Sequence, residues 1–146
     1  MWFKNLQLYR LPKNWAAEAA PLEEQLARLT LQGCSATDPR SIGWVSPRDG
    51  GSLIHSVNQQ WLLALGVEEK LLPTSIVKRF ASDRAKEIEE TEGRRIGRRE
   101  MRELVEAMTV ELLPRAFIRR RSTYGWIDRS NGWLVVDAAS PAKAEE

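Results

Sequence analysis

The chain opens with a stretch in which apolar and polar residues alternate. Leu6 and Leu8 alternate with Asn5 and Gln7. A period of two places every second side chain on the same face of a strand. We therefore expect a strand over residues 2–11 with one buried face.

The following segment predicts one helix, a long connection and a second strand. Leucines recur at spacings of four and three before Gly33, as in an amphipathic helix, at Leu22, Leu26 and Leu29. Residues 33–52 are rich in Gly, Pro, Ser and Asp, so we expect an irregular connection there, with room for a short strand at Trp44 and Val45. Residues 57–67 are mainly apolar and indicate a largely buried strand.

Residues 74–114 predict two helices that form an antiparallel hairpin. Thr74 and Ser75 offer an N-cap for a helix running to about Glu92. Its apolar stripe consists of Ile76, Val77, Phe80, Ala81 and Ile88. Gly93 and Gly97 interrupt this pattern, and Pro114 should end the second helix. The second stripe consists of Met101, Leu104, Val105, Met108 and Leu112.

The last part of the sequence predicts a β-hairpin. Residues 117–127 and 133–137 flank Asn131 and Gly132, a pair suited to a type I′ turn. Trp126 and Trp133 should lie near each other across this hairpin. After Asp137 no apolar pattern appears, so we expect the chain to fray there or to have been cut.

These patterns together predict an α+β fold. The strands would form an antiparallel sheet with the first helix packed on it and the 74–114 hairpin projecting from it. The chain of 146 residues, with 42% hydrophobic residues and six tryptophans, suits one domain over residues 1–146.

The composition excludes several kinds of chemistry. With one cysteine and one histidine, the chain has neither an internal disulfide nor a Cys/His zinc site. We expect Cys34 to be a buried small side chain and His55 to be a hydrogen-bonded loop or strand residue. A turn role for Asp128 is a simpler expectation than a metal-dependent nuclease site with Asp137.

No segment indicates catalysis or membrane insertion. The sequence has no glycine-rich phosphate loop, nucleophile elbow or paired-acid motif, so we expect neither enzymatic activity nor a cofactor. It lacks a run of about 18 apolar residues, and Lys4 and Arg10 interrupt the apolar N-terminus. The protein is expected in the cytoplasm.

Positive charge is concentrated in two short stretches. The net charge of +2 says little about a polyanionic partner by itself. Residues 94–102 hold five arginines against Glu100, however, and residues 115–121 hold four arginines against no acid. Guanidinium groups are permanently charged and donate two parallel hydrogen bonds to phosphate oxygens. The two stretches therefore favour contact with a nucleic-acid backbone.

A solvated charged surface is the alternative explanation. Arginines of the 94–102 stretch could pair with acids at the end of the preceding helix, at Glu87, Glu89, Glu90 and Glu92. In a strand over 117–127, Arg119 and Arg121 would share one face, and Arg120 would lie on the other with Ile118.

Several segments together resemble one protein family. They are WFKNLQLYRL, GWV, EEKLLP, LLPRAF and a WID, NG and VVDAAS ending, and they occur in order over nearly the whole chain. The chain resembles the RdgC family of bacterial recombination-associated proteins. Members of that family are about twice as long, so the chain resembles their N-terminal half.

The resemblance implies a DNA-binding protein without catalytic activity. Such a protein would bind double-stranded DNA with little sequence preference, with single-stranded DNA as a second option, and would restrain RecA-dependent recombination on the nucleoid. The family forms a ring-shaped homodimer around DNA, and Phe117 would be a subunit contact, with core packing as the alternative. The candidate DNA-binding residues are Arg115, Arg119, Arg120, Arg121, Arg98, Arg99, Lys78 and Arg79.

Two other functions remain open from the sequence. The protein could act by binding the recombinase directly, without DNA, through its Trp-rich hairpin and Phe117. A nuclease is motivated only by the abundant carboxylates.

Overall fold

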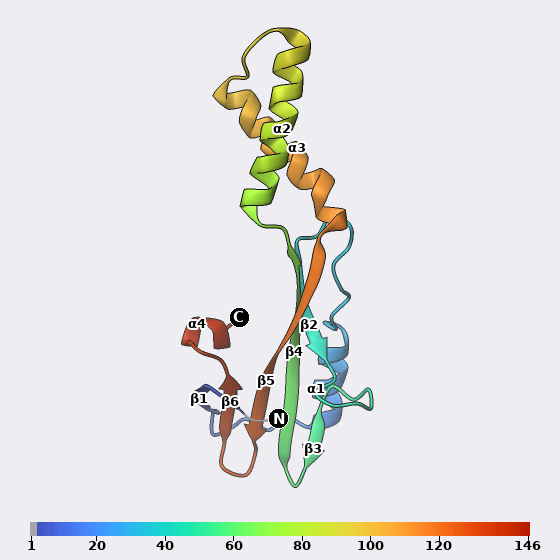
Figure 1. Cartoon of the computed structure of the whole chain (residues 1–146). Coiled ribbons are helices and arrows are strands. Elements are labelled where there is room, and N and C mark those ends of the chain that lie inside the picture. The colour runs from blue at the N-terminus through green and yellow to red at the C-terminus, as the bar shows by residue number, and fades with distance from the viewer. Residues whose placement is uncertain (1–2) are drawn as a thin grey trace. The chain divides into compact units, whose positions relative to one another are not determined.

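Residues 3–146 are described by a computed structural model, and they divide into two compact units (Figure 1). Unit 1 comprises the residues up to Gln32, Ser41–Val67 and Arg120 onward, and unit 2 comprises Gly33–Arg40 and Glu68–Arg119. The elements in chain order are β1 (Leu6–Arg10), α1 (Ala19–Ala27), β2 (Arg40–Val45), β3 (His55–Val57), β4 (Gln60–Leu71), α2 (Thr74–Glu92), α3 (Arg98–Leu112), a 3₁₀ turn η1 (Leu113–Arg115), β5 (Phe117–Asp128), β6 (Trp133–Asp137) and α4 (Pro141–Ala144).

The strands form one six-stranded sheet, in the order β1-β6-β5-β4-β2, with β3 paired to β4. β6 runs antiparallel to both β1 and β5, and β3 runs antiparallel to β4. The α+β fold with an antiparallel sheet, predicted from the hydrophobic pattern, is confirmed.

The core of unit 1 forms around Trp61, whose side chain is only 1% exposed. The Trp61 ring meets that of Trp15 edge to face, with ring centroids 5.9 Å apart. Leu26 of α1 and Ile127 of β5 complete the contact between helix and sheet. The predicted amphipathic helix is confirmed, although it begins at Ala19 and ends at Ala27.

The segment expected to be one strand over residues 57–67 is two strands joined by a turn. Asn58 and Gln59 have φ angles of 47° and 63°, the left-handed conformation that a type I′ hairpin turn requires at both central residues. The predicted, largely buried strand is confirmed over residues 60–67 of β4, but its start was wrong because the turn that precedes β4 lacks the usual glycine. The short strand expected at Trp44 and Val45 exists and begins earlier, at Arg40.

Unit 2 is built on the helices α2 and α3. Both match the predicted ranges closely, and α3 ends at Leu112, before Pro114. The predicted cap was wrong: Thr74 is already helical, and Pro73 occupies the cap position without a side-chain hydrogen bond. Gly93 ends α2 in the left-handed conformation, with a φ angle of 66°.

Residues 33–40 are hydrogen-bonded to the last residues of β4 within unit 2. The backbone N–H of Cys34 donates to Glu68 Oε2 at 3.0 Å, and Lys70 Nζ donates to the Ala36 carbonyl at 2.7 Å. These bonds give partners to Glu68 and Lys70, both of which are buried. Cys34 itself is only partly buried, so the prediction of a buried cysteine was wrong in degree.

The C-terminal hairpin differs from the prediction at its turn and at its end. Among the described residues of this turn only Gly132 has a positive φ, of 71°, so the turn is not type I′. Trp126 pairs with Val135, and Trp133 with Asp128, which places the two tryptophans diagonally on one face. The residues after Asp137 do not fray: Ser140 caps α4 by accepting a hydrogen bond from the Lys143 N–H, and Pro141 begins the helix.

None of the helices within residues 3–146 is long and apolar enough to cross a membrane. The strand predicted for residues 2–11 is confirmed over Leu6–Arg10, and Trp2 lies outside the described residues. The expected buried face was wrong, because Leu6 and Leu8 are exposed.

Candidate nucleic-acid interface

The first half of β5 is exposed along its whole length. Residues 117–122 form an unbroken run of six exposed positions, which means that neither face of the strand is covered there. Arg119, Arg120 and Arg121 belong to this run, and Arg115 is exposed in η1 just before it. Phe117 is 84% exposed, so it does not pack in a core formed by residues 3–146.

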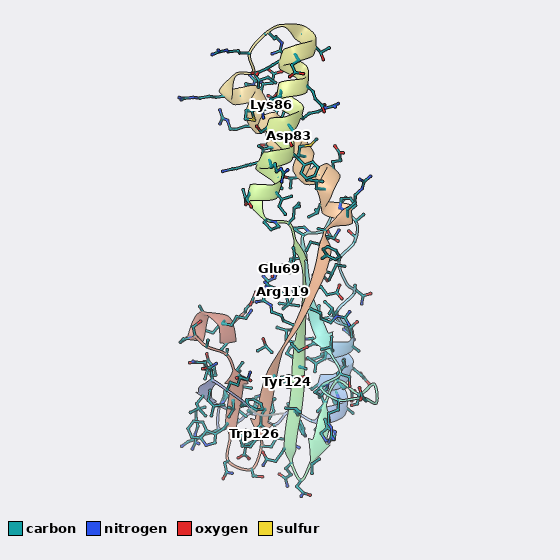
Figure 2. The ribbon with its side chains drawn as sticks, in the orientation of Figure 1. Glu69, Asp83, Lys86, Arg119, Tyr124 and Trp126 are labelled. Carbon is teal, nitrogen blue, oxygen red and sulfur yellow. The ribbon has the colours of Figure 1, made fainter. Side chains whose placement is uncertain are left out.

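Arg119 is held by an acidic neighbour in unit 2. Its Nη2 atom lies 2.8 Å from Glu69 Oε2, and the two side chains retain 49% and 36% of their accessible surface (Figure 2). Glu69 was not identified from the sequence, since it lies 50 residues away and only strand pairing brings it near. Such an exposed ion pair contributes little free energy and can exchange its partner.

Arg120 and Arg121 belong to unit 1, where both are exposed. Each of them has an interaction within the protein. Arg115 takes part in no ion pair within residues 3–146. The β5 arginines are therefore at the surface, with different degrees of internal pairing.

Arg94 is neutralised by two carboxylates near the junction of α2 and α3. It donates to Glu100 at 2.7 and 2.6 Å and to Glu92 at 2.5 Å. The hydrogen bond to Glu100, followed by that to Glu92, raises the pKa of Arg94 above its ordinary value. The same bond lowers the pKa of Glu100. The prediction that intramolecular pairing consumes part of this cluster is confirmed for Arg94.

The acids that pair with the arginines of residues 94–102 are mostly not those expected from the sequence. Only Glu92 among the four predicted carboxylates contacts the 94–102 arginines within the described chain. Glu87 pairs with Arg84, and Glu89 accepts a hydrogen bond from the Ile96 N–H. The expectation for Glu87 and Glu89 was wrong because the chain turns at Gly93 and brings Glu100 to Arg94 instead.

Arg98 and Arg99 are the first two residues of α3. Arg99 pairs with Glu103 one turn later, at 3.0 Å, but its side chain is 90% exposed. Gly97 at the cap position provides no side chain to accept the first N–H groups of the helix. Cations are unfavourable at this positive end of the helix dipole, which offsets the small gain from the Arg99–Glu103 pair.

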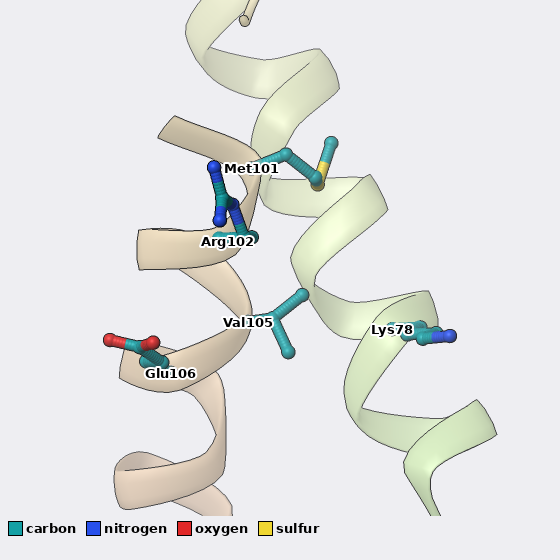
Figure 3. A pocket seen from close by; sticks show the side chains of 5 residues that line it. All are labelled: Lys78, Met101, Arg102, Val105 and Glu106. Carbon is teal, nitrogen blue, oxygen red and sulfur yellow. The ribbon is translucent and has the colours of Figure 1, made fainter. Parts of the chain in front are cut away.

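Lys78 and Arg79 are exposed on α2. Lys78 lines a cavity of about 460 Å³ between α2 and α3, together with Met101, Arg102, Val105 and Glu106 (Figure 3). Met101 and Val105 contribute apolar side chains to its lining, and Lys78, Arg102 and Glu106 contribute charged ones. Arg79 is not among the residues of this cavity, so the two neighbours do not form one site there.

The residues assigned structural roles are explained by hydrogen bonds. Asp128 accepts hydrogen bonds from the Asn131 N–H, Asn131 Nδ2 and Gln60 Nε2 at 3.1, 2.8 and 2.9 Å, which confirms its turn role. These bonds, that of the Asn131 side chain first, lower the pKa of Asp128. His55 lies in β3 and contacts Arg48 Nη1 at 3.1 Å, as a hydrogen-bonded strand residue.

Within residues 3–146, no three His, Cys, Asp or Glu side chains are grouped so as to hold a metal ion.

Comparison with known proteins assigns the family. The sequence model of the RdgC family, described as "Putative exonuclease, RdgC", matches residues 1–146. Two proteins named "Recombination-associated protein RdgC" are similar over the whole chain: that of Herminiimonas arsenicoxydans is 55% identical and that of Dechloromonas aromatica (strain RCB) 53% identical. The chain covers 49% and 48% of their lengths, so it spans about half of the curated relatives it matches. It belongs to the RdgC family.

Proposed function

We propose that the protein binds double-stranded DNA through its phosphate backbone, without sequence preference and without cutting it. As part of a ring-shaped dimer on the nucleoid, it would occupy DNA and thereby restrain RecA-dependent recombination. The observation that carries this proposal is the exposed run at the start of β5, with three consecutive arginines and Arg115 just before it. The names of the relatives, which associate them with recombination, support the same role.

The exposed ion pairs of these arginines are compatible with phosphate binding. The Arg119–Glu69 pair is half exposed, so solvent screens it and a phosphate can replace the carboxylate at little cost. Each phosphate that is neutralised releases condensed counterions, which contributes a log-log salt slope of about −0.9. Affinity would therefore fall steeply as salt increases.

A second group of cations lies on the helical part of unit 2. Arg95, Arg98 and Arg102 are exposed and take part in no ion pair within residues 3–146. Lys78 and Arg79 add two exposed cations on α2. We propose these as auxiliary contacts, weaker than those of β5 because both α2 and α3 also carry glutamates.

Phe117 is proposed as a subunit contact of the dimer. An aromatic side chain with 84% exposure is unfavourable in a free monomer, and burial against a partner would stabilise the dimer by roughly 1.5–3 kcal/mol. The substitution Phe117→Ala should shift the solution mass toward the monomer while it leaves the chain folded. An unchanged mass distribution would remove Phe117 from the interface.

The decisive test is a salt titration of duplex binding. Replacement of Arg115, Arg119, Arg120 and Arg121 by alanine should reduce the slope by about 0.9 for each lost contact. A matched control removes four other exposed cations, Lys4, Lys13, Arg28 and Arg48. The proposal fails if both variants change the affinity and the slope equally.

Strand cleavage needs its own measurement, since the family description mentions an exonuclease. We expect end-labelled duplex to remain intact with the protein and Mg²⁺ or Mn²⁺. Metal-dependent shortening that copurifies with the protein and is lost in a point variant would establish an enzyme instead.

Direct action on the recombinase is the second candidate function. It is favoured by the exposed Phe117, which needs no DNA to bind a protein surface. Inhibition of strand exchange should vanish in excess duplex if the protein acts by DNA occupancy. Inhibition that persists in excess duplex and is lost in Phe117→Ala would support direct binding.

A further inference from the structure

The strand register in unit 1 separates two faces of the sheet. Residues paired across antiparallel strands project to the same side, so Leu8, Val135 and Trp126 form one row. Tyr9, Leu134 and Ile127 form the adjacent row on the opposite side. Ile127 belongs to the buried core and Leu134 packs against it, which identifies their side as the core face.

Both helices of unit 1 lie on the core face. Leu26 of α1 is part of the core and Leu22 packs against it. Lys143 and Ala144 of α4 line a small cavity with Leu134, Val136 and Gly125, which also project to that side. No helix of the described part of unit 1 is therefore assigned to the other face.

We call this other side of the sheet the bare face, and it carries large apolar residues. Leu6 and Leu8 of β1 are 52% and 62% exposed, and Trp126 and Trp133 are 37% exposed each. Gln60 lies on the same face, because its side chain accepts a hydrogen bond from Trp126. Val57 is paired with Gln60 and therefore adds another exposed apolar side chain to this face. The exposed residues that define the bare face are Leu6, Leu8, Val57, Trp126 and Trp133, whereas Val135 on the same side is only 3% exposed.

An antiparallel sheet that faces water on one side normally places polar residues there. The bare face instead carries five large exposed apolar side chains beside Arg10, Asp128 and Asp137, and exposed apolar side chains grouped on one face generally mark an interaction site. Its polar groups are already satisfied: Trp126 Nε1 donates to Gln60 Oε1 at 2.7 Å, and Arg10 lies over the Trp133 ring at 4.4 Å. Arg10 also donates to the Asn131 carbonyl at 3.1 Å. This surface is suited to apolar contact with protein rather than to phosphate.

We propose that the bare face is the docking surface for a second layer, formed by the other half of an RdgC-length polypeptide. Domains bury each apolar sheet face against another layer, and unit 1 has a layer on one face only. The match covers only 48–49% of the relatives' lengths, so each relative has an unmatched part about as long as this chain. That remaining half is thus a partner of sufficient size. This proposal depends on the family assignment and not on DNA binding.

The test is co-expression of this chain, tagged, with the unmatched half of the Herminiimonas arsenicoxydans relative. We expect the two polypeptides to copurify in equal amounts. The double substitution Leu8→Glu and Trp126→Glu should reduce the captured amount at least tenfold, because charged side chains would have to be buried in the contact. Circular dichroism and thermal unfolding of each variant show whether the chain itself still folds.

The matched control is Leu29→Glu, which alters a leucine of similar exposure, 66%, that is not part of the bare face. Capture by this variant should equal that of the unmodified chain. If the double variant no longer folds, Leu6→Glu at the edge strand replaces it in the same assay.

Four outcomes would overturn the proposal. The first is no capture by the unmodified chain, and the second is equal loss of capture in the Leu29→Glu control. The third is a dimer of this chain alone that bare-face substitutions convert to a monomer, since the occupant is then a second copy. The fourth is loss of single-stranded DNA affinity in the bare-face variant with capture unchanged, since the tryptophans then stack on bases.

Discussion

The two units of the protein bury different kinds of side chains. Unit 1 is centred on Trp61, with leucines and isoleucines from the sheet and α1 around it. In unit 2, α2 buries only Val77, Ala81 and Ala85, and α3 has no buried residue. Small side chains at the helix contact bury little area, so unit 2 obtains less hydrophobic free energy for its length.

This difference indicates that buried apolar residues of unit 1 contribute most of the folding free energy, whereas the charged surface of unit 2 contributes little. The surface of the α2–α3 hairpin holds arginines and glutamates in nearly equal numbers, several of them in exposed ion pairs. Such pairs contribute little to folding and can be rearranged without loss of the fold. We therefore expect substitutions to have large effects on stability in unit 1 and small effects on the surface of unit 2.

The largest effect is expected for Trp61→Ala. Removal of a fully buried tryptophan leaves a cavity and should lower the free energy of unfolding by about 3–5 kcal/mol. Chemical denaturation followed by circular dichroism measures this loss. Trp133→Ala, at a half-exposed position, is the control and should cost much less; equal losses would contradict the assignment of the core.

A smaller effect is expected for Gly43→Ala in β2. A Cβ atom there would lie 2.4 Å from the Leu31 backbone nitrogen, so the backbone must shift, at a cost of about 1–3 kcal/mol. Gly125→Ala in β5 is the matched control, because its Cβ would meet nothing within 4 Å. In thermal unfolding, the melting temperature of Gly43→Ala should be well below that of Gly125→Ala. The reverse order would exclude the close packing of β2 against the Leu31 backbone.

The effect of Asp128→Asn should depend on pH. Hydrogen bonds from Asn131 and Gln60 hold the pKa of Asp128 below its ordinary value, so the charged form stabilises the fold. This contribution is complete above the ordinary carboxyl pKa, near 4, and is lost as the pH falls through the lower value of the folded state. The difference in melting temperature between the two proteins should therefore be larger at pH 7 than at pH 3. A difference independent of pH would show that the charge is not involved.

The smallest effect is expected for Glu100→Gln in unit 2. The substitution breaks an exposed charge pair with Arg94, which retains Glu92 as a partner. Thermal unfolding should be nearly unchanged, and any difference should disappear in high salt, which screens exposed charges. A large loss would mean that this junction is as important to folding as the core of unit 1.

The sequence was sufficient to predict elements with a clear period. The limits of α2 and α3 follow from the helical spacing of their apolar residues and from the glycines between them. For the arginine stretch of β5, strand alternation predicted one exposed face with Arg119 and Arg121, whereas residues 117–122 are exposed on both faces, Arg120 included.

Features that depend on tertiary contacts could not be predicted in this way. The partner of Arg119 is Glu69, which comes near only after β4 and β5 are in place. The apolar residues of β1 predicted one buried face, whereas the register with β6 directs Leu6 and Leu8 away from the core. Amino-acid pattern indicates that a face is apolar, but not which layer covers it.

The turn at Asn58 and Gln59 sets the register between β3 and β4. Side chains alternate along a strand, so a shift of one residue in this pairing would reverse which side chains of the two strands share a face. Because β4 is also paired with β5, insertion of a single residue at this turn would turn over the three-residue strand β3 rather than β4. The positive φ angles of two adjacent residues are consequently a determinant of the side of the sheet that Val57 faces.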